Sequence, residues 1–168
     1  MQLEFTKMHG AGNDVIVFEA PRDGTLPSAA RWRELSDRHK GIGFDQAMVL
    51  EPPRRAGTDV YYRIFNADGG EVEQCGNGVR CLAELLRQRG QARNGHLQLE
   101  SPAGIIAAEL GRPGTVAVDM GEPEFTPAAV AFDAQGQSGP RFHVDLPRGR
   151  VEFAIVSNFP ARTSTSMV

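Results

Sequence analysis

The sequence predicts an α+β protein in which a mixed or mostly antiparallel sheet packs against one central helix, with a second helix outside. Short apolar segments separated by turn residues occur along most of the chain and are typical of strands. The clearest helix runs from Gly76 to about Arg89, because its apolar residues form one wide face at helical spacing. The regular strand–helix alternation of a doubly wound fold is absent.

The first half of the chain is predicted to contain four strands and one short helix. Ser28 is a residue type that caps helices, so a helix is expected from there to about His39, with Trp32 and Leu35 on its inner face. Residues 9–14 are predicted to form a loop, because they are rich in glycine and turn residues. Alternation or enrichment in Tyr, Ile and Phe predicts strands near residues 3–5, 15–19, 46–51 and 59–66.

The second half contains the central helix and then short strands only. Gly90 is expected to end the helix. Three strands separated by turns follow and predict a β-meander, at residues 96–101, 105–110 and 115–120. Residues 121–127 resemble a linker, and two further strands at 141–146 and 151–157 would begin a second unit. We therefore expect a first domain at residues 1–120 and an incomplete second one at 121–168.

Composition excludes several classes of function. The 168 residues carry a formal net charge of -3 and no basic block, which argues against a nucleic-acid partner. The longest apolar stretches, such as Val15–Phe18, are far too short to span a membrane. The N-terminus lacks a signal-peptide pattern, and two cysteines six positions apart form neither a disulfide framework nor a convincing metal site. We expect a cytoplasmic protein with reduced thiols.

Cys75 is the main candidate catalytic residue. It lies directly before the predicted central helix and is followed by Gly76-Asn77-Gly78. The first N–H groups of a helix have no partner inside it and carry partial positive charge, so they stabilise a thiolate and can bind a carboxylate. A free cysteine is often only a small buried apolar residue. The glycines favour the functional interpretation, because they leave the N–H groups unobstructed.

The other polar candidates have ordinary structural alternatives. Asn13, Gln46 and Asn66 lie at loops or strand ends, where an amide can face a ligand or simply satisfy its own turn. Cys81 lies among apolar residues inside the helix, and we interpret it as structural. No histidine is marked as a base for Cys75; the four are His9, His39, His96 and His143.

Taken together, the motifs resemble the diaminopimelate epimerase family. The most specific is Gln74-Cys-Gly-Asn-Gly-Val-Arg-Cys81. The others, in family order, are Lys7-Met-His-Gly-Ala-Gly-Asn-Asp14, Asp37-Arg-His-Lys-Gly-Ile-Gly-Phe-Asp-Gln46, Tyr62-Arg-Ile-Phe-Asn-Ala-Asp-Gly69 and Asp119-Met-Gly-Glu-Pro123. Proline racemases carry Cys-Gly-His-Gly instead, and phenazine-pathway isomerases lack this cysteine block, so both fit less well.

The resemblance implies a fold of two similar domains facing across a cleft, each a sheet around a central helix. It implies cofactor-independent interconversion of LL- and meso-diaminopimelate, in which one thiolate removes the α-proton and a second thiol returns one to the opposite face. Cys75 would be the first of these cysteines. Gly76 and Asn77 would hold the α-carboxylate through backbone N–H groups, and Asn13, Gln46 and Asn66 would contact the rest of the substrate.

The end of the chain departs from the family. There, a strand similar to residues 151–157 leads into a Gly-Asn-Pro-His loop, whereas here Asn158-Phe159-Pro160 follows. The second Cys-Gly block and a Glu-Arg pair are also missing. We interpret this as an out-of-frame end and expect a chain that does not epimerise diaminopimelate at an enzymatic rate alone. An incomplete second sheet is expected to favour self-association, including a homodimer.

Two other functions compete with the epimerase. A non-catalytic remnant would bind an amino-acid carboxylate weakly or bind nothing. A cysteine-dependent hydrolase would need a base beside Cys75, which the sequence does not identify. Exchange of a substrate α-hydrogen with deuterated water distinguishes the epimerase from both.

Overall fold

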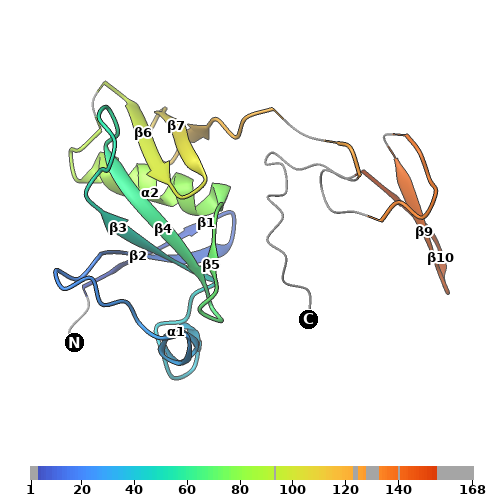
Figure 1. Ribbon diagram of the computed structural model, residues 1–168, viewed down its shortest axis with the longest axis horizontal. Helices are drawn as coiled ribbons and strands as arrows, with labels where there is room; N and C mark the ends of the chain where they lie inside the picture. Colours follow the sequence, from blue (N-terminus) through green and yellow to red (C-terminus); the bar gives the residue numbers. More distant parts are fainter. Residues whose placement is uncertain (1–3, 93, 123–124, 128–132, 140, 155–168) are drawn as a thin grey trace. The chain divides into compact units, whose positions relative to one another are not determined.

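The computed structural model describes residues 4–92, 94–122, 125–127, 133–139 and 141–154. The chain divides into two compact units, and the boundary falls between Asp119 and Met120. Within these residues, the first unit contains two helices and a sheet, and the second contains a hairpin (Figure 1). None of the described helices is long and apolar enough to cross a membrane.

The first unit is built on one mixed sheet of eight strands in the described part of the chain. The strand order is β1-β2-β3-β4-β6-β7-β8, and the two-residue β5 pairs with β4. Two pairs, β2 with β3 and β4 with β6, are parallel, while the others are antiparallel. The strands are β1 Thr6–Gly10, β2 Asn13–Glu19, β3 Gln46–Glu51, β4 Val60–Asn66, β5 Glu71–Val72, β6 His96–Ser101, β7 Gly104–Leu110 and β8 Val116–Val118.

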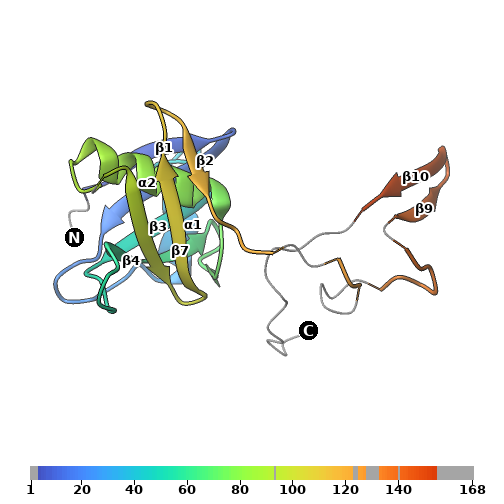
Figure 2. The ribbon, with the colours of Figure 1, turned by 90° about the horizontal axis from the view of Figure 1, so that it is seen from above.

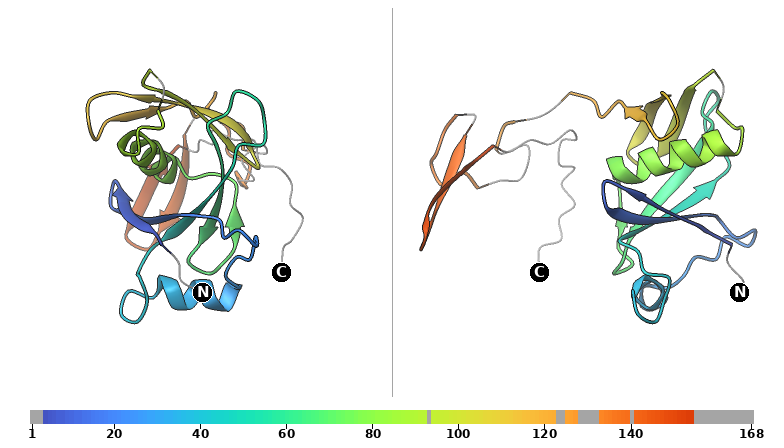
Figure 3. Two further views of the ribbon diagram at one scale, coloured as in Figure 1. Left: turned by 90° about the vertical axis from the view of Figure 1, so that its left-hand side faces the viewer. Right: turned by 180° about the vertical axis from the view of Figure 1, so that it is seen from behind.

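The sheet curves around helix α2 (Gly76–Gln88). The helix packs on β1 and β2 at one end of the strand order and on β7 and β8 at the other. A single helix can touch both ends of a seven-strand path only if the sheet curls around it. Both panels of Figure 3 show α2 between the β1–β2 hairpin and the strands β6 and β7. The predicted sheet around a central helix is confirmed.

The amphipathic pattern of α2 explains its central position. Its inward residues are fully or almost fully buried and are mostly apolar: Val79, Cys81, Leu82, Ala83, Leu85 and Leu86. Burial of such side chains is worth about 1.5–3 kcal/mol each for the larger ones, so the apolar face fixes the rotation of the helix against the sheet. The chain leaves the helix at Gly90, which has a φ of 70°.

Helix α1 (Ala29–Ser36) covers the outer face of the sheet. Ser28 caps it by accepting a hydrogen bond from the Arg31 N–H at 3.3 Å. Trp32 is only 1% exposed and stacks on Phe65, with ring centroids 5.3 Å apart. Phe18 and Phe44 complete the aromatic cluster. The predicted inner face is confirmed.

Helix α1 ends three residues earlier than predicted. Asp37 accepts the N–H groups of His39 at 2.7 Å and Lys40 at 2.9 Å, so its side chain competes with helical hydrogen bonding. These two N–H groups also lower the pKa of the Asp37 carboxyl, that of His39 most. The chain then turns back, and Ile42 donates its N–H to the Leu35 carbonyl at 2.8 Å.

The prediction of a loop at residues 9–14 is wrong. His9 pairs with Asp14 and Gly10 with Asn13, so β1 and β2 form a hairpin. Ala11 and Gly12, with φ values of 52° and 88°, make a two-residue turn of the kind that hairpins prefer. Turn-forming residue types on both sides of this tight turn conceal the strand pairing from a pattern-based prediction.

The second unit contains a two-stranded antiparallel hairpin, β9 (Phe142–Leu146) and β10 (Gly149–Phe153) (Figure 2). Phe142 faces Phe153 and Val144 faces Val151 across the pair. Both strands were expected, and β10 begins two residues before the predicted start. The predicted last residues of the second strand, 155–157, and the atypical tail at 158–168 lie outside the described residues.

Replacing Trp32 tests whether the outer aromatic cluster stabilises the first unit. Trp32→Ala is expected to lower the free energy of unfolding by about 3–5 kcal/mol, because a large buried side chain leaves a cavity. Arg31→Ala, on the exposed side of the same helix, should change it by less than about 0.5 kcal/mol. Urea denaturation followed by far-ultraviolet circular dichroism measures both, and equal effects would show that Trp32 is not part of the core.

Candidate active site

Cys75 is the N-cap residue of α2. Its backbone is extended, with φ −153° and ψ 99°, and its sulfur accepts a hydrogen bond from the Gly78 N–H at 3.2 Å. Its carbonyl accepts the Val79 N–H at 2.9 Å. The thiol therefore occupies the position in which Ser, Thr or Asp usually caps a helix, where partial positive charge favours an anionic sulfur.

Two N–H groups of the first turn remain open. Gly78 and Val79 donate to Cys75, whereas no acceptor is found for the N–H groups of Gly76 and Asn77 among the residues that the structure describes. Both residues are half-buried. Neighbouring N–H groups at a helix N-terminus form an anion-binding site of a size that suits one carboxylate.

Two glycines let neighbouring strands approach this turn closely. A Cβ on Gly10, at the end of β1, would lie 2.9 Å from the Asn77 carbonyl oxygen. A Cβ on Gly78 would lie 2.9 Å from the Met48 sulfur and 3.5 Å from the Cys75 sulfur. The first turn of α2 is thus packed against β1 and β3. Space requires glycine at position 10, where the obstructing atom is backbone, whereas a Cβ at position 78 would need the Met48 side chain to shift.

Three side-chain amides form a row beside the thiol. Asn13 begins β2, Gln46 begins β3 and Asn66 ends β4, and the last two are register partners. The Asn13 Nδ2 donates to Gln46 Oε1 at 3.2 Å, and Gln46 Nε2 donates to Asn66 Oδ1 at 3.1 Å. We call these three residues the amide row; all are half-buried.

The amide row is connected to the thiol. Asn13 Nδ2 also lies 3.8 Å from the Cys75 sulfur, within hydrogen-bond distance for sulfur. Side chains alternate between sheet faces, so the row shares a face with Met48 and Ile64, which lie towards α2. The structure therefore brings together all six residues singled out from the sequence: Asn13, Gln46, Asn66, Cys75, Gly76 and Asn77.

Cys81 has a different environment. It is 4% exposed within α2. Burial raises the pKa of the Cys81 thiol, the nearby Cys75 raises it further, and Arg80 opposes the rise. Both cysteines are free thiols. The interpretation of Cys81 as a structural residue agrees with this burial.

Sequence reasoning missed two buried polar groups near the site. The Tyr62 hydroxyl and the Gln74 Oε1 are buried without a well-formed hydrogen bond to any described residue. Burial raises the pKa of Tyr62 to about 12; the nearby Ser101 hydroxyl opposes the rise, and Cys75 adds to it. Both residues belong to the sequence blocks around Asn66 and Cys75, which was the available signal.

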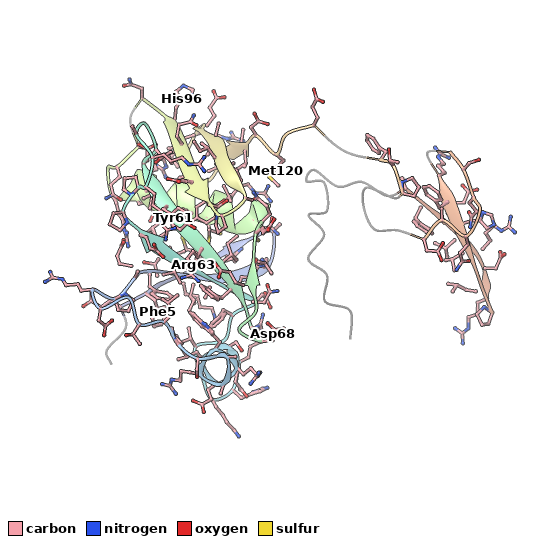
Figure 4. All side chains as sticks on the ribbon, viewed as in Figure 1. Phe5, Tyr61, Arg63, Asp68, His96 and Met120 are labelled. Atoms are coloured by element: carbon pink, nitrogen blue, oxygen red, sulfur yellow. The ribbon has the colours of Figure 1, made fainter. Side chains whose placement is uncertain are left out.

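In the described part of the chain, no histidine or carboxylate is hydrogen-bonded to Cys75 as the base that a hydrolase mechanism needs. The hydrogen-bond partners found for its sulfur among the described residues are the Asn13 amide and the Gly78 N–H. His96 begins β6, whose pairing with the first residues of β4 places it at the sheet end opposite Asn66. Figure 4 shows His96 and Asp68, which follows β4, at these two ends.

Other features of the described residues carry no chemistry of their own. A hollow of about 670 Å³ lies at the C-terminal end of α2, away from Cys75, and is lined in part by Glu19, Glu51 and Leu86. Within the described ranges, no group of three or more His, Cys, Asp or Glu side chains could hold a metal ion. The thiol, the open N–H groups and the amide row are therefore the best candidate site.

Comparison with known proteins decides the family. The model of the family described as diaminopimelate epimerase matches residues 5–126. The chain belongs to the diaminopimelate epimerase family. Diaminopimelate epimerase of Chromobacterium violaceum is 45% identical over 157 residues, covering 94% of this chain and 56% of that protein. The Cupriavidus metallidurans enzyme is 49% identical over 136 residues, covering 81% and 47%. The chain thus spans about half the length of these curated relatives.

Solved structures agree on the fold of this family member. A hydroxyproline epimerase from Agrobacterium vitis superposes with a TM-score of 0.58 at 16% identity, covering 92% of this chain and 48% of that one. A phenazine biosynthesis protein of the PhzF family from Bacillus anthracis gives 0.54 at 22% identity, covering 75% and 43%. These likenesses confirm the predicted epimerase-like α+β fold.

The two thiols of this epimerase-family chain should differ in reactivity. Cys75 is expected to be alkylated roughly tenfold or more faster than Cys81 in the native state, because helix N–H groups stabilise its thiolate while Cys81 is buried. Brief iodoacetamide treatment followed by peptide mapping measures both rates, and unfolded chain serves as the control. Equal labelling, or faster labelling of Cys81, would contradict the site assignment.

The Tyr62 hydroxyl should make the fold sensitive to alkaline pH. Its folded pKa lies above the unfolded value of 10, so the unfolded chain releases this proton first and stability falls as pH rises towards 12. Between pH 10 and pH 12 the free energy of unfolding should fall by roughly 3 kcal/mol. Tyr62→Phe should be nearly neutral at pH 7, because the hydroxyl has no well-formed hydrogen bond.

The measurement is urea denaturation of wild type and Tyr62→Phe at several pH values. The stability difference between them should grow in favour of Phe above pH 10 by about 1.4 kcal/mol per unit. Tyr61→Phe, which retains Tyr62, should keep the loss. A difference that is constant with pH would show that Tyr62 ionises equally in both states.

Proposed function

We propose that this chain carries half of the active site of a diaminopimelate epimerase, which interconverts the LL and meso isomers without a cofactor. The observation that carries the proposal is the placement of the Cys75 sulfur beside the open N–H groups of Gly76 and Asn77. This arrangement puts a base next to a carboxylate site, which α-proton removal requires. The small-molecule substrate, the role of each site residue and a cytoplasmic location are part of the proposal.

In this mechanism the Cys75 thiolate takes the α-proton of the bound substrate. The C–H electron pair remains on the α-carbon and spreads into the neighbouring carboxylate. Negative charge therefore grows on the carboxylate oxygens, where the N–H groups of Gly76 and Asn77 and the positive end of α2 stabilise it. Fixed dipoles aimed at developing charge are usually the largest single contribution to catalysis.

The amide row is proposed to bind the rest of the substrate. Diaminopimelate carries a second amino-acid group at its far end, with a carboxylate and an ammonium that each need hydrogen-bond partners. Asn13, Gln46 and Asn66 supply neutral donors and acceptors on the sheet face towards α2, beside the thiol. Holding the far end there keeps the α-hydrogen near Cys75, so binding energy serves orientation.

Epimerisation needs a second acid on the opposite face of the α-carbon. Cys81 is unsuitable, because it is buried within α2 about 9 Å along the axis from Cys75, at 1.5 Å per residue. We propose that the second thiol belongs to the second domain of the full-length family enzyme, following a first domain at residues 1–120. Self-association of this chain remains a prediction.

Deuterium exchange tests the proposal with the chain as it is. LL-diaminopimelate in deuterated water should acquire α-deuterium slowly in the presence of the purified chain, without conversion to the meso isomer at an enzymatic rate. Cys75→Ala should lower the exchange about 10²–10⁴-fold, the usual contribution of a general base. Mass spectrometry and chiral chromatography give the two measurements.

The matched control is Cys81→Ala, which removes the other thiol and should retain exchange. Exchange that persists in Cys75→Ala would refute Cys75 as the base. Robust LL-to-meso conversion by wild type would refute the need for a second domain. Binding of diaminopimelate with no exchange in wild type would favour the competing function, a carboxylate-binding module without turnover.

A further inference from the structure

Two carboxylates stand at the starts of the neighbouring parallel strands β2 and β3. Asp14 directly follows Asn13, and Asp45 directly precedes Gln46, so each is the chain neighbour of one member of the amide row. The Asp14 N–H donates to Asp45 Oδ2 at 2.8 Å, and the Asp45 N–H donates to the Asp14 carbonyl at 2.9 Å. The two strand starts are therefore bonded reciprocally.

This pairing also brings two negative charges together on the outer sheet face. Because side chains alternate across a strand, Asp14 and Asp45 point away from the face that carries Asn13 and Gln46. Like charges this close repel each other, and the repulsion would separate the strand starts. The amides on the other face would then move apart with them.

Arg38 bridges the two carboxylates. Its Nη2 lies 3.1 Å from Asp14 Oδ2 and 3.0 Å from Asp45 Oδ1. The guanidinium comes from the segment after α1, and Gly43 holds this segment closely: a Cβ on Gly43 would lie 3.1 Å from both Cα and Cγ of Arg38. Gly43 has a φ of 75°, which favours glycine in any case.

We propose that Arg38 is a positioning residue, which holds the starts of β2 and β3 together and so sets the contact between Asn13, Gln46 and Cys75. It acts from the outer face, without reaching the thiol itself. The consequence is local: Asn13 Nδ2 keeps its 3.2 Å bond to Gln46 and its 3.8 Å approach to the sulfur only while the Asp14–Asp45 pair is neutralised. The inference rests on the proposed function for its importance in catalysis, but its geometry is independent of turnover.

Arg38→Gln in the full chain tests the proposal through two measurements that need no turnover. The first is the side-chain amide resonances of Asn13 and Gln46 in nitrogen-15 spectra, which report their hydrogen bonds directly. The second is the alkylation rate of Cys75 at pH 7. In Arg38→Gln we expect both amide resonances to shift and the alkylation rate to fall at least about twofold, because the thiolate loses the Asn13 donor.

A charge rescue separates positioning from general stability. Arg38→Gln/Asp45→Asn removes the repulsion as well as the cation, so its amide resonances and alkylation rate should return towards wild type. Arg31→Gln, which breaks the exposed Arg31–Glu34 pair on α1, is the matched control and should change neither measurement. Arg38→Lys keeps the charge and should retain most of the wild-type behaviour.

Unchanged amide resonances in Arg38→Gln would overturn the proposal. So would changes that the added Asp45→Asn fails to reverse, since a lost structural contact would give that result. If Arg38→Gln does not fold, Asp45→Asn and Arg38→Lys still test the bridge from each side. Wild-type amide resonances in Asp45→Asn, and in the double variant Arg38→Gln/Asp45→Asn, would then support charge neutralisation. Failure of the deuterium-exchange assay would refute the proposed function without affecting any of these results.

Discussion

The contact of α2 with both ends of the strand order is the constraint on which the site depends. Because β1 and β8 touch the same helix, the sheet cannot open without exposing the apolar face of α2. That face holds several fully buried side chains, each worth about 1.5–3 kcal/mol, so the curvature of the sheet is strongly favoured. The N-terminus of α2 is consequently held where β2, β3 and β4 present Asn13, Gln46 and Asn66.

Packing and electrostatics have different roles at this helix end. A negative charge at an exposed helix N-terminus is stabilised by about 0.3–1 kcal/mol, and by up to about 2 kcal/mol where it is partly buried. These values are too small to position a helix, but they are large enough to favour an anion at Cys75 or at the neighbouring N–H groups. Packing thus fixes the geometry, and the dipole and N–H groups supply the chemistry. Gly10 contributes to the packing, since a Cβ there would press on the Asn77 backbone and force the turn away from β1.

Most of the fold could be predicted from periodicity and residue type. The wide apolar face of α2, the Ser28 cap and the strand at Gln46–Glu51 depend on local signals, and the structure places all three where the sequence indicates. The hairpin at His9–Asp14 could not be predicted in this way, because its residues are turn formers on both sides of a two-residue turn. Local patterns also carry no information on strand order.

The candidate site also divides into residues that local sequence indicates and residues whose contacts only the tertiary structure provides. Cys75, Gly76 and Asn77 are adjacent in sequence, and helix-end physics alone makes them candidates. Asn13, Gln46 and Asn66 are separated by up to 53 positions; residue type alone left a ligand contact and a turn role both open for them, and the family motifs favoured the ligand contact. Their mutual hydrogen bonds depend on the register of β2, β3 and β4. The Arg38 bridge and the buried Tyr62 hydroxyl depend on tertiary contacts that no pattern within one segment encodes.

The amide row also has a direction. Each member donates to the next, from Asn13 through Gln46 to Asn66, and the second Asn13 proton is directed to the sulfur. The carbonyl oxygen of Asn13, one N–H of Gln46 and the NH2 group of Asn66 are then the amide groups without partners among the described residues. A ligand lying along the row meets an oxygen at one end and an NH2 group at the other. Such a row distinguishes an ammonium from a carboxylate by position, and these are two of the three contacts needed to tell mirror-image arrangements on a single carbon apart.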